Sequence, residues 1–212
     1  MAKKILIGVA GIILLLLIVI ATRPATYHVE RSVTIAAPAS AVFPWVADLH
    51  KFGAWSPWAE LDPEMKVAFE GPETGVGSIY RWDGNDQVGA GSLTVTAYVP
   101  NEKVAMDLIF LEPFASAAKS GLQVAADGEG ATKVTWSLDG DNNFMGKAMS
   151  LVMDMDTMIG ADYEKGLAKL GTVVKKSVSE VAAAPAAGAA DLPTDGDAGA
   201  AKADEPAAAK QE

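Results

Sequence analysis

Residues 144–181 read FMGKAMSLVMDMDTMIGADYEKGLAKLGTVVKKSVSEV, and this stretch decides the fold. Large apolar side chains recur in it every three or four residues, which is the spacing of one face of an α-helix. The polar run 139–143 just before it offers helix N-caps, and Pro185 follows its end. The pattern therefore predicts one long amphipathic helix of about 35 residues at the end of the folded part of the chain.

Glycine recurs within this predicted helix, at Gly146, Gly160, Gly166 and Gly171. Each glycine in a helix interior costs about 1 kcal/mol relative to alanine. We expect them to serve a close approach between the helix and a sheet, or a bend of the helix over the sheet.

Short runs upstream of the helix have the patterns of β-strands. The first, residues 27–35, places Val29, Val33 and Ile35 on one side and polar side chains on the other. Pro38 and Ser40 then open the first of two short helices. Further strands are predicted at residues 65–70, 77–82, 91–99, 103–111, 120–126 and 132–138. Short strands with short connections indicate an antiparallel sheet.

Several motifs also resemble a known family. They are Val29-Glu30-Arg31, Ala37-Pro38 with Val42-Phe43, Trp55-Ser56-Pro57-Trp58, Gly75-Val76-Gly77-Ser78, Trp82-Asp83-Gly84-Asn85, Val88-Gly89-Ala90-Gly91, Thr132-Lys133-Val134-Thr135-Trp136, and the run from Gly160 to Leu167. These motifs are similar to the SRPBCC superfamily, which is START-like and polyketide cyclase-dehydrase-like, over residues 27–170. The resemblance implies an α+β helix-grip fold, in which an antiparallel seven-stranded curved sheet wraps around a long C-terminal helix. It does not fix the activity, because the superfamily holds lipid carriers, sterol binders, cyclases and ring-hydroxylase subunits.

The N-terminus has the pattern of a membrane anchor. An uncharged run, residues 5–22, would span roughly 27 Å as a helix, close to the hydrocarbon thickness of a bilayer. Lys3 and Lys4 precede it, so residues 1–24 are predicted as a transmembrane anchor with a cytoplasmic N-terminus. The rest of the chain would then be extracytoplasmic, and periplasmic in a bacterium. The alternative is a cleaved signal peptide with a site at Val19-Ile20-Ala21.

Composition separates a folded middle, residues 27–182, from an alanine-, aspartate- and proline-rich tail, residues 183–212, which we expect to be disordered. The middle holds 12 basic and 21 acidic residues. A nucleic-acid partner needs a basic surface, so this class of partner is not expected. The chain contains no cysteine, which excludes disulfides, thiolate nucleophiles and Cys-ligated metals.

A search for catalytic or metal-binding groups finds no convincing set. His28 and His50 have no second nearby histidine in the sequence. Residues 139–143 begin like a calcium loop, but Phe144 stands where glycine is needed and Ser150 where glutamate is needed. A helix N-cap is the better interpretation. We predict no catalytic residue, no metal and no cofactor.

Aromatic and methionine side chains give the positive signal. If the fold is right, the aromatic side chains of the strands and loops surround the underside of the last helix, and together with the methionines on that helix they form the wall of an apolar cavity. The candidates are Trp55, Trp58, Tyr80, Trp82, Met106, Leu108, Phe110, Trp136, Met149, Met153 and Tyr163. The competing interpretation is that these side chains are plain core. Asp107 should face solvent by its alternation in its strand, whereas Arg81 is ambiguous.

Three functions stay open on this basis. The leading hypothesis is a binding domain for a hydrophobic small molecule or lipid, held at the membrane by residues 5–22. The second is a polyketide cyclase/dehydratase-like enzyme, which needs a titratable group in the cavity with a partner in reach. The third is an envelope interaction module whose core is filled.

Overall fold

The computed structural model describes residues 1–183. Its elements are α1 (Ala2–Ala21), β1 (Thr26–Ile35), α2 (Ala39–Ala47), α3 (Leu49–Phe52), η1 (Trp58–Glu60), β2 (Lys66–Glu70), β3 (Ile79–Asp83), β4 (Ala90–Val99), β5 (Lys103–Glu112), β6 (Ser116–Ala126), β7 (Thr132–Asp141), α4 (Phe144–Met149) and α5 (Met155–Ala183). The predicted disordered tail, apart from Ala183, lies outside the described residues.

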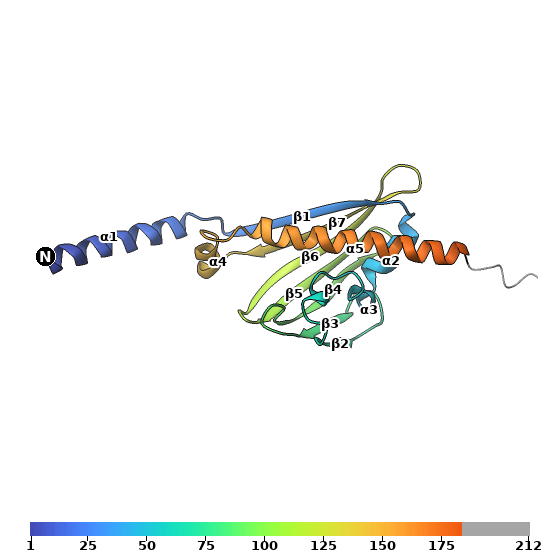
Figure 1. Cartoon of the computed structure of the whole chain (residues 1–212), viewed down its shortest axis with the longest axis horizontal. Helices are drawn as coiled ribbons and strands as arrows, with labels where there is room; N and C mark the ends of the chain where they lie inside the picture. Colours follow the sequence, from blue (N-terminus) through green and yellow to red (C-terminus); the bar gives the residue numbers. More distant parts are fainter. Residues whose placement is uncertain (184–212) are drawn as a thin grey trace, which may run out of the picture.

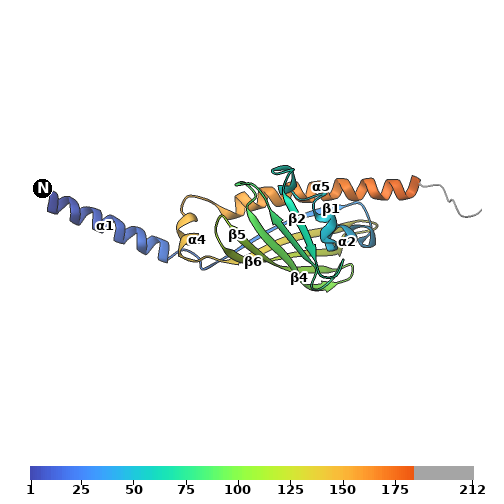
Figure 2. The same cartoon turned by 90° about the horizontal axis from the view of Figure 1, so that it is seen from below.

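The seven strands form one antiparallel sheet in the order β1-β7-β6-β5-β4-β3-β2. The sheet curves around one side of α5, which packs mainly against β1 and to a lesser extent against β7 (Figure 1). Figure 1 shows β3 and β2 at the edge of the sheet away from this helix, and Figure 2 shows the same sheet from below. The two short helices α2 and α3 follow β1, as expected. The predicted α+β helix-grip fold is therefore confirmed.

The prediction of a single helix over residues 144–181 is wrong, because the chain forms two helices there. Asn143 caps the first: its side chain accepts a hydrogen bond from the backbone N–H of Gly146 at 2.9 Å. Asp154 starts the second, accepting from the backbone N–H of Asp156 at 3.1 Å and from the hydroxyl of Thr157 at 2.7 Å. A second capping residue inside the apolar repeat thus divides the stretch into α4 and α5.

Two of the glycines bring α5 close to the sheet, as expected. A Cβ atom on Gly160 would overlap the guanidinium group of Arg31. One on Gly166 would lie 3.0 Å from the ring of Trp136 and from the ring of Pro57. At Gly171 the nearest atom would be 3.9 Å away, so this position needs no glycine.

Helix α1 projects from the folded domain and contacts it through α4, and all its residues except Ile20 are exposed. The helix has 20 residues, and its most apolar 18-residue stretch has a mean hydropathy of 3.0. It is therefore long and apolar enough to cross a membrane. A signal sequence has the same properties, so the anchor stays a prediction. At the domain side, Arg23 donates to the hydroxyl of Ser150 at 3.1 Å and to its carbonyl at 2.9 Å.

Candidate ligand-binding face

The concave side of the sheet, toward α5, is filled by aromatic rings at its centre. Trp136 of β7 and Tyr163 of α5 stack face to face, with ring centroids 3.8 Å apart and an interplanar angle of 8°. Trp55, from the loop after α3, meets the Trp136 ring edge-on at 5.1 Å. Its indole N–H donates to the carbonyl of Trp45 at 2.9 Å. Burial and ring stacking together hold the helix against the sheet here.

Ser120 supplies the polar group at this centre. Its hydroxyl is buried and accepts a hydrogen bond from the indole N–H of Trp136 at 3.1 Å. Burial raises the pKa of Tyr163, and the hydrogen bond with Ser120 offsets only part of that rise. Tyr163 is therefore a neutral phenol at neutral pH, able to donate a hydrogen bond but not to act as a base.

The same face continues toward β3 and the end of β5 as a row of half-buried apolar side chains. The row consists of Trp58, Trp82, Leu108 and Phe110. The rings of Trp82 and Phe110 meet edge-on at 5.7 Å. Gly91, opposite Trp82 in the sheet, leaves room for the indole, since a Cβ there would lie 2.6 Å from the Trp82 ring.

The structure divides the eleven predicted cavity residues into three groups. Five are buried in the packed centre, namely Trp55, Tyr80, Met106, Trp136 and Tyr163. Four form the half-buried row: Trp58, Trp82, Leu108 and Phe110. The other two, Met149 and Met153, were expected on the long helix, but they lie before the start of α5 and are 44% and 42% exposed.

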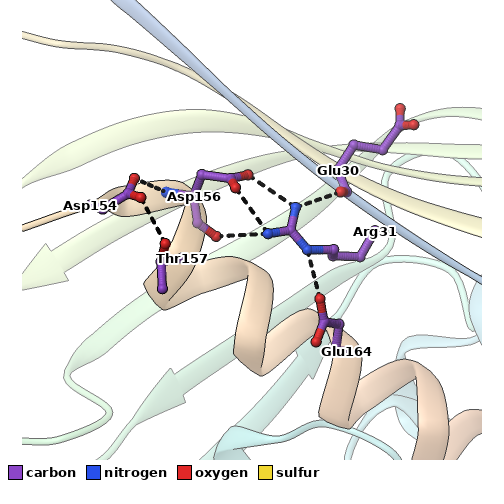
Figure 3. A network of polar contacts seen from close by, with 6 residues as sticks. All are labelled: Glu30, Arg31, Asp154, Asp156, Thr157 and Glu164. Atoms are coloured by element: carbon purple, nitrogen blue, oxygen red, sulfur yellow. Dashed lines mark hydrogen bonds and ion pairs between the residues drawn. The ribbon is translucent and has the colours of Figure 1, made fainter.

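An ion-pair network joins β1 to α5, and the sequence analysis missed it. Arg31 lies on the same face of β1 as Val29 and Val33, and it donates to both carboxylate oxygens of Asp156 at 3.0 Å and to Glu164 at 2.9 Å (Figure 3). The hydrogen bond with Asp156 contributes most to raising the pKa of Arg31 above its ordinary range. The position of Arg31 in the strand alternation was the available signal.

Other polar residues lie outside the concave face. Asp107 pairs with Lys119 at 3.3 Å on the convex side, which confirms its predicted outward orientation. Arg81, ambiguous in the sequence, pairs with Glu70 at 2.7 Å. His28 lies 2.7 Å from a carboxylate oxygen of Asp139 at the surface.

His50 stacks on Phe69, with ring centroids 3.9 Å apart. Within residues 1–183, no group of three or more His, Asp or Glu side chains is placed to hold a metal ion. Asn143 acts as a helix cap, as the sequence indicated.

Together these features define a helix-grip domain whose concave face is apolar and aromatic. The comparisons then identify the family: residues 26–175 match the model of the "Polyketide cyclase / dehydrase and lipid transport" family, and the chain belongs to this family. The resemblance seen in the sequence is thereby confirmed. No curated protein matches the chain.

Solved structures share the fold at low sequence identity. A Thermobifida fusca protein solved by NMR has a TM-score of 0.53 and 19% identity, covering 70% of this chain and 93% of that one. The Zhui aromatase/cyclase from Streptomyces sp. R1128 has a TM-score of 0.51 and 17% identity, covering 72% and 96%. A Mesorhizobium loti protein has the same score and identity, covering 72% and 98%. At these identities the likeness shows the fold alone.

Proposed function

We propose that this protein binds a hydrophobic small molecule or lipid against the half-buried apolar part of its concave face. The observation that carries the proposal is the half-buried apolar row, formed by Trp58, Trp82, Leu108 and Phe110. Concave surfaces with aromatic side chains and few polar groups are typical of small-molecule sites. Family membership supports the same class of ligand.

The chemistry of the face favours binding over cyclase-like catalysis. Its tyrosines Tyr80 and Tyr163 have raised pKa values, in both cases chiefly because they are buried. They remain protonated at neutral pH and are poor general bases, which a cyclase or dehydratase needs. Arg31, on the same face, is already engaged by Asp156 and Glu164. A ligand would therefore be recognised by shape and apolar contact.

The proposal includes the location of the domain. Helix α1 would span the membrane, with Lys3 and Lys4 on the cytoplasmic side and the domain outside. Only four residues, 22–25, separate the helix from β1, so the binding face would stay close to the bilayer. An apolar ligand partitions into that bilayer, which makes the location consistent with the ligand class.

Ligand capture is tested with the full chain purified from its own host in a mild detergent. Native mass spectrometry and organic extraction would detect an apolar species that co-purifies. Phe110→Ala should reduce its occupancy by roughly tenfold, because a partly buried phenyl ring contributes on the order of 1.5 kcal/mol. Ile109→Ala is the matched control, since the adjacent side chain of β5 points to the convex face.

The outcomes separate the hypotheses. A ligand lost from Phe110→Ala but retained by Ile109→Ala supports the binding domain. A clean apo mass, unchanged after incubation with lipid extracts of the host, overturns it and favours the interaction module with a filled core.

A further inference from the structure

Large apolar side chains gather on the segment that joins β7 to α5. Six of the ten residues in 144–153 are large, apolar and exposed: Phe144 (59%), Met145 (59%), Met149 (44%), Leu151 (36%), Val152 (79%) and Met153 (42%). The segment is α4 followed by the irregular turn before α5. Its apolar side chains are not needed for the packed centre of the domain, which leaves them open for another contact.

This segment lies at the end of the domain that α1 enters (Figures 1 and 2). Helix α1 contacts α4, and Arg23 holds Ser150 through both its hydroxyl and its carbonyl. The four residues 22–25 can span at most about 14 Å when fully extended. If α1 crosses a bilayer, α4 is thus held at the bilayer surface.

A second apolar loop lies at the same end. Leu111 at the end of β5 is 59% exposed, and Phe114 in the turn between β5 and β6 is 75% exposed. The strand register places this turn on the α1 side of the sheet. The end of β7 pairs with the start of β1 on one side, through Asp141 and Thr26, and with the start of β6 on the other, through Gly140 and Ala118. The opposite end carries the polar β6–β7 turn, residues 127–131, with the sequence DGEGA.

We propose that residues 144–153, together with Leu111 and Phe114, form a membrane-contacting surface that inserts into the boundary between lipid headgroups and acyl chains. The inference rests on the proposed anchoring by α1. The charged groups nearby are of both signs, with Lys147 and Arg23 beside Glu112, Asp141, Asp154 and Asp156. The contact is therefore hydrophobic and does not require anionic lipid.

The surface also deepens the proposed function. Phe110 lies one residue before Leu111 at the end of β5, although strand alternation points the two side chains to opposite faces. The half-buried row therefore ends at the same end of the sheet as the proposed membrane-contacting surface, which would leave a ligand from the bilayer a short path to it. The contacting surface thus joins the source of the ligand to the site proposed to hold it.

The absence of cysteine permits a direct test with single-cysteine variants of the full chain. Val152→Cys and Phe114→Cys place an environment-sensitive fluorophore, NBD, on the two parts of the surface. Glu129→Cys, in the exposed β6–β7 turn, is the control at the far end. Leu14→Cys, within α1, reports on the anchor by itself. Each labelled protein is reconstituted in phosphatidylcholine vesicles that contain phosphatidylcholine with a doxyl quencher near the headgroup, and the Leu14→Cys protein also in vesicles whose doxyl quencher lies deep in the acyl chain.

We expect doxyl lipid to quench the fluorophores at positions 152 and 114 at least threefold more than the one at position 129. Equal and weak quenching at 152, 114 and 129, with strong quenching at 14, overturns the membrane-contacting surface while the anchor stands. Weak quenching at position 14 as well overturns the anchor, and the inference with it. Shielding of position 152 from aqueous quenchers without quenching by doxyl lipid also overturns the inference, because it indicates a protein partner.

Discussion

The guanidinium group of Arg31 lies against the backbone of Gly160, in the space that a side chain at that position would occupy. Asp156 and Glu164, one turn of α5 before and one turn after Gly160, bind the same guanidinium from either side (Figure 3). A strand residue and three helix positions thus fix how α5 sits along β1. The lack of a side chain at Gly160 is as necessary to this arrangement as the charges of Arg31, Asp156 and Glu164.

Gly160→Ala should destabilise the domain, because the added methyl group overlaps the Arg31 guanidinium. Overpacking of this kind costs about 1–3 kcal/mol, more than the gain in helix propensity. Gly171→Ala is the matched control: its methyl group meets no atom closer than 3.9 Å, and the helix should gain up to about 1 kcal/mol. Thermal unfolding of both variants in the same detergent measures the difference. Equal melting temperatures would contradict the packing described for Arg31.

Acid should weaken the contact between β1 and α5. The hydrogen bond from Arg31 holds the pKa of Asp156 below its ordinary value of 3.8, against a smaller effect of burial. Because the folded-state pKa is the lower one, the stabilisation is complete above pH 3.8 and is lost as the pH falls through the folded-state pKa.

Asp156→Asn tests this linkage. The variant should melt a few degrees below the native chain at neutral pH, and the two melting temperatures should converge as the pH approaches about 2. Glu129→Gln, in the exposed β6–β7 turn, should show no such convergence. If the difference in melting temperature between the native chain and Asp156→Asn does not change with pH, the ion pair with Arg31 is not the cause of that difference.

Ser120→Ala should disturb the aromatic centre. The change removes the acceptor of the Trp136 indole N–H, and a buried donor without a partner costs about 1–3 kcal/mol. Ser116→Ala, at the exposed start of the same strand, should have little effect. Chemical unfolding followed by tryptophan fluorescence reports both stabilities. A loss of stability no larger in Ser120→Ala than in Ser116→Ala would show that the hydrogen bond is not a stabilising one.

The overall fold could be predicted from the sequence because its signals are local and repeated. Alternation in β1 and β7, and the three-to-four spacing in α5, persist over many residues. The break at Ser150 was missed for a related reason. The apolar spacing continues through Met149 and Met153, and only the capping side chain of Asp154 indicates a new helix start. A hydrogen bond of one side chain is a weaker signal than a long hydrophobic repeat.

The candidate site could be predicted only by residue type. Aromatic residues were correctly assigned to the concave face, but their division into a packed centre and a half-buried row depends on the path of α5. That path is set by Arg31 on Gly160 and by Trp136 beneath Gly166, two contacts between residues more than 25 positions apart. Spacing along the chain does not reveal such pairs, and the cluster of methionines placed Met149 and Met153 on the long helix, whereas both precede α5.

The orientation of the chain across the membrane gives a further prediction. Lys3 and Lys4 are the only charged residues that precede the apolar helix, and the positive-inside rule places them in the cytoplasm. A membrane-impermeant maleimide should therefore label Glu129→Cys in cells whose outer barrier has been made permeable, and should label Ala2→Cys, which keeps both lysines, only after the inner membrane is disrupted. Labelling of both positions before disruption would indicate that the chain does not span the membrane. The reverse pattern would place the domain in the cytoplasm, where it could not take an apolar ligand from the outer leaflet. Because the native chain contains no cysteine, all labelling of each variant comes from its single introduced cysteine.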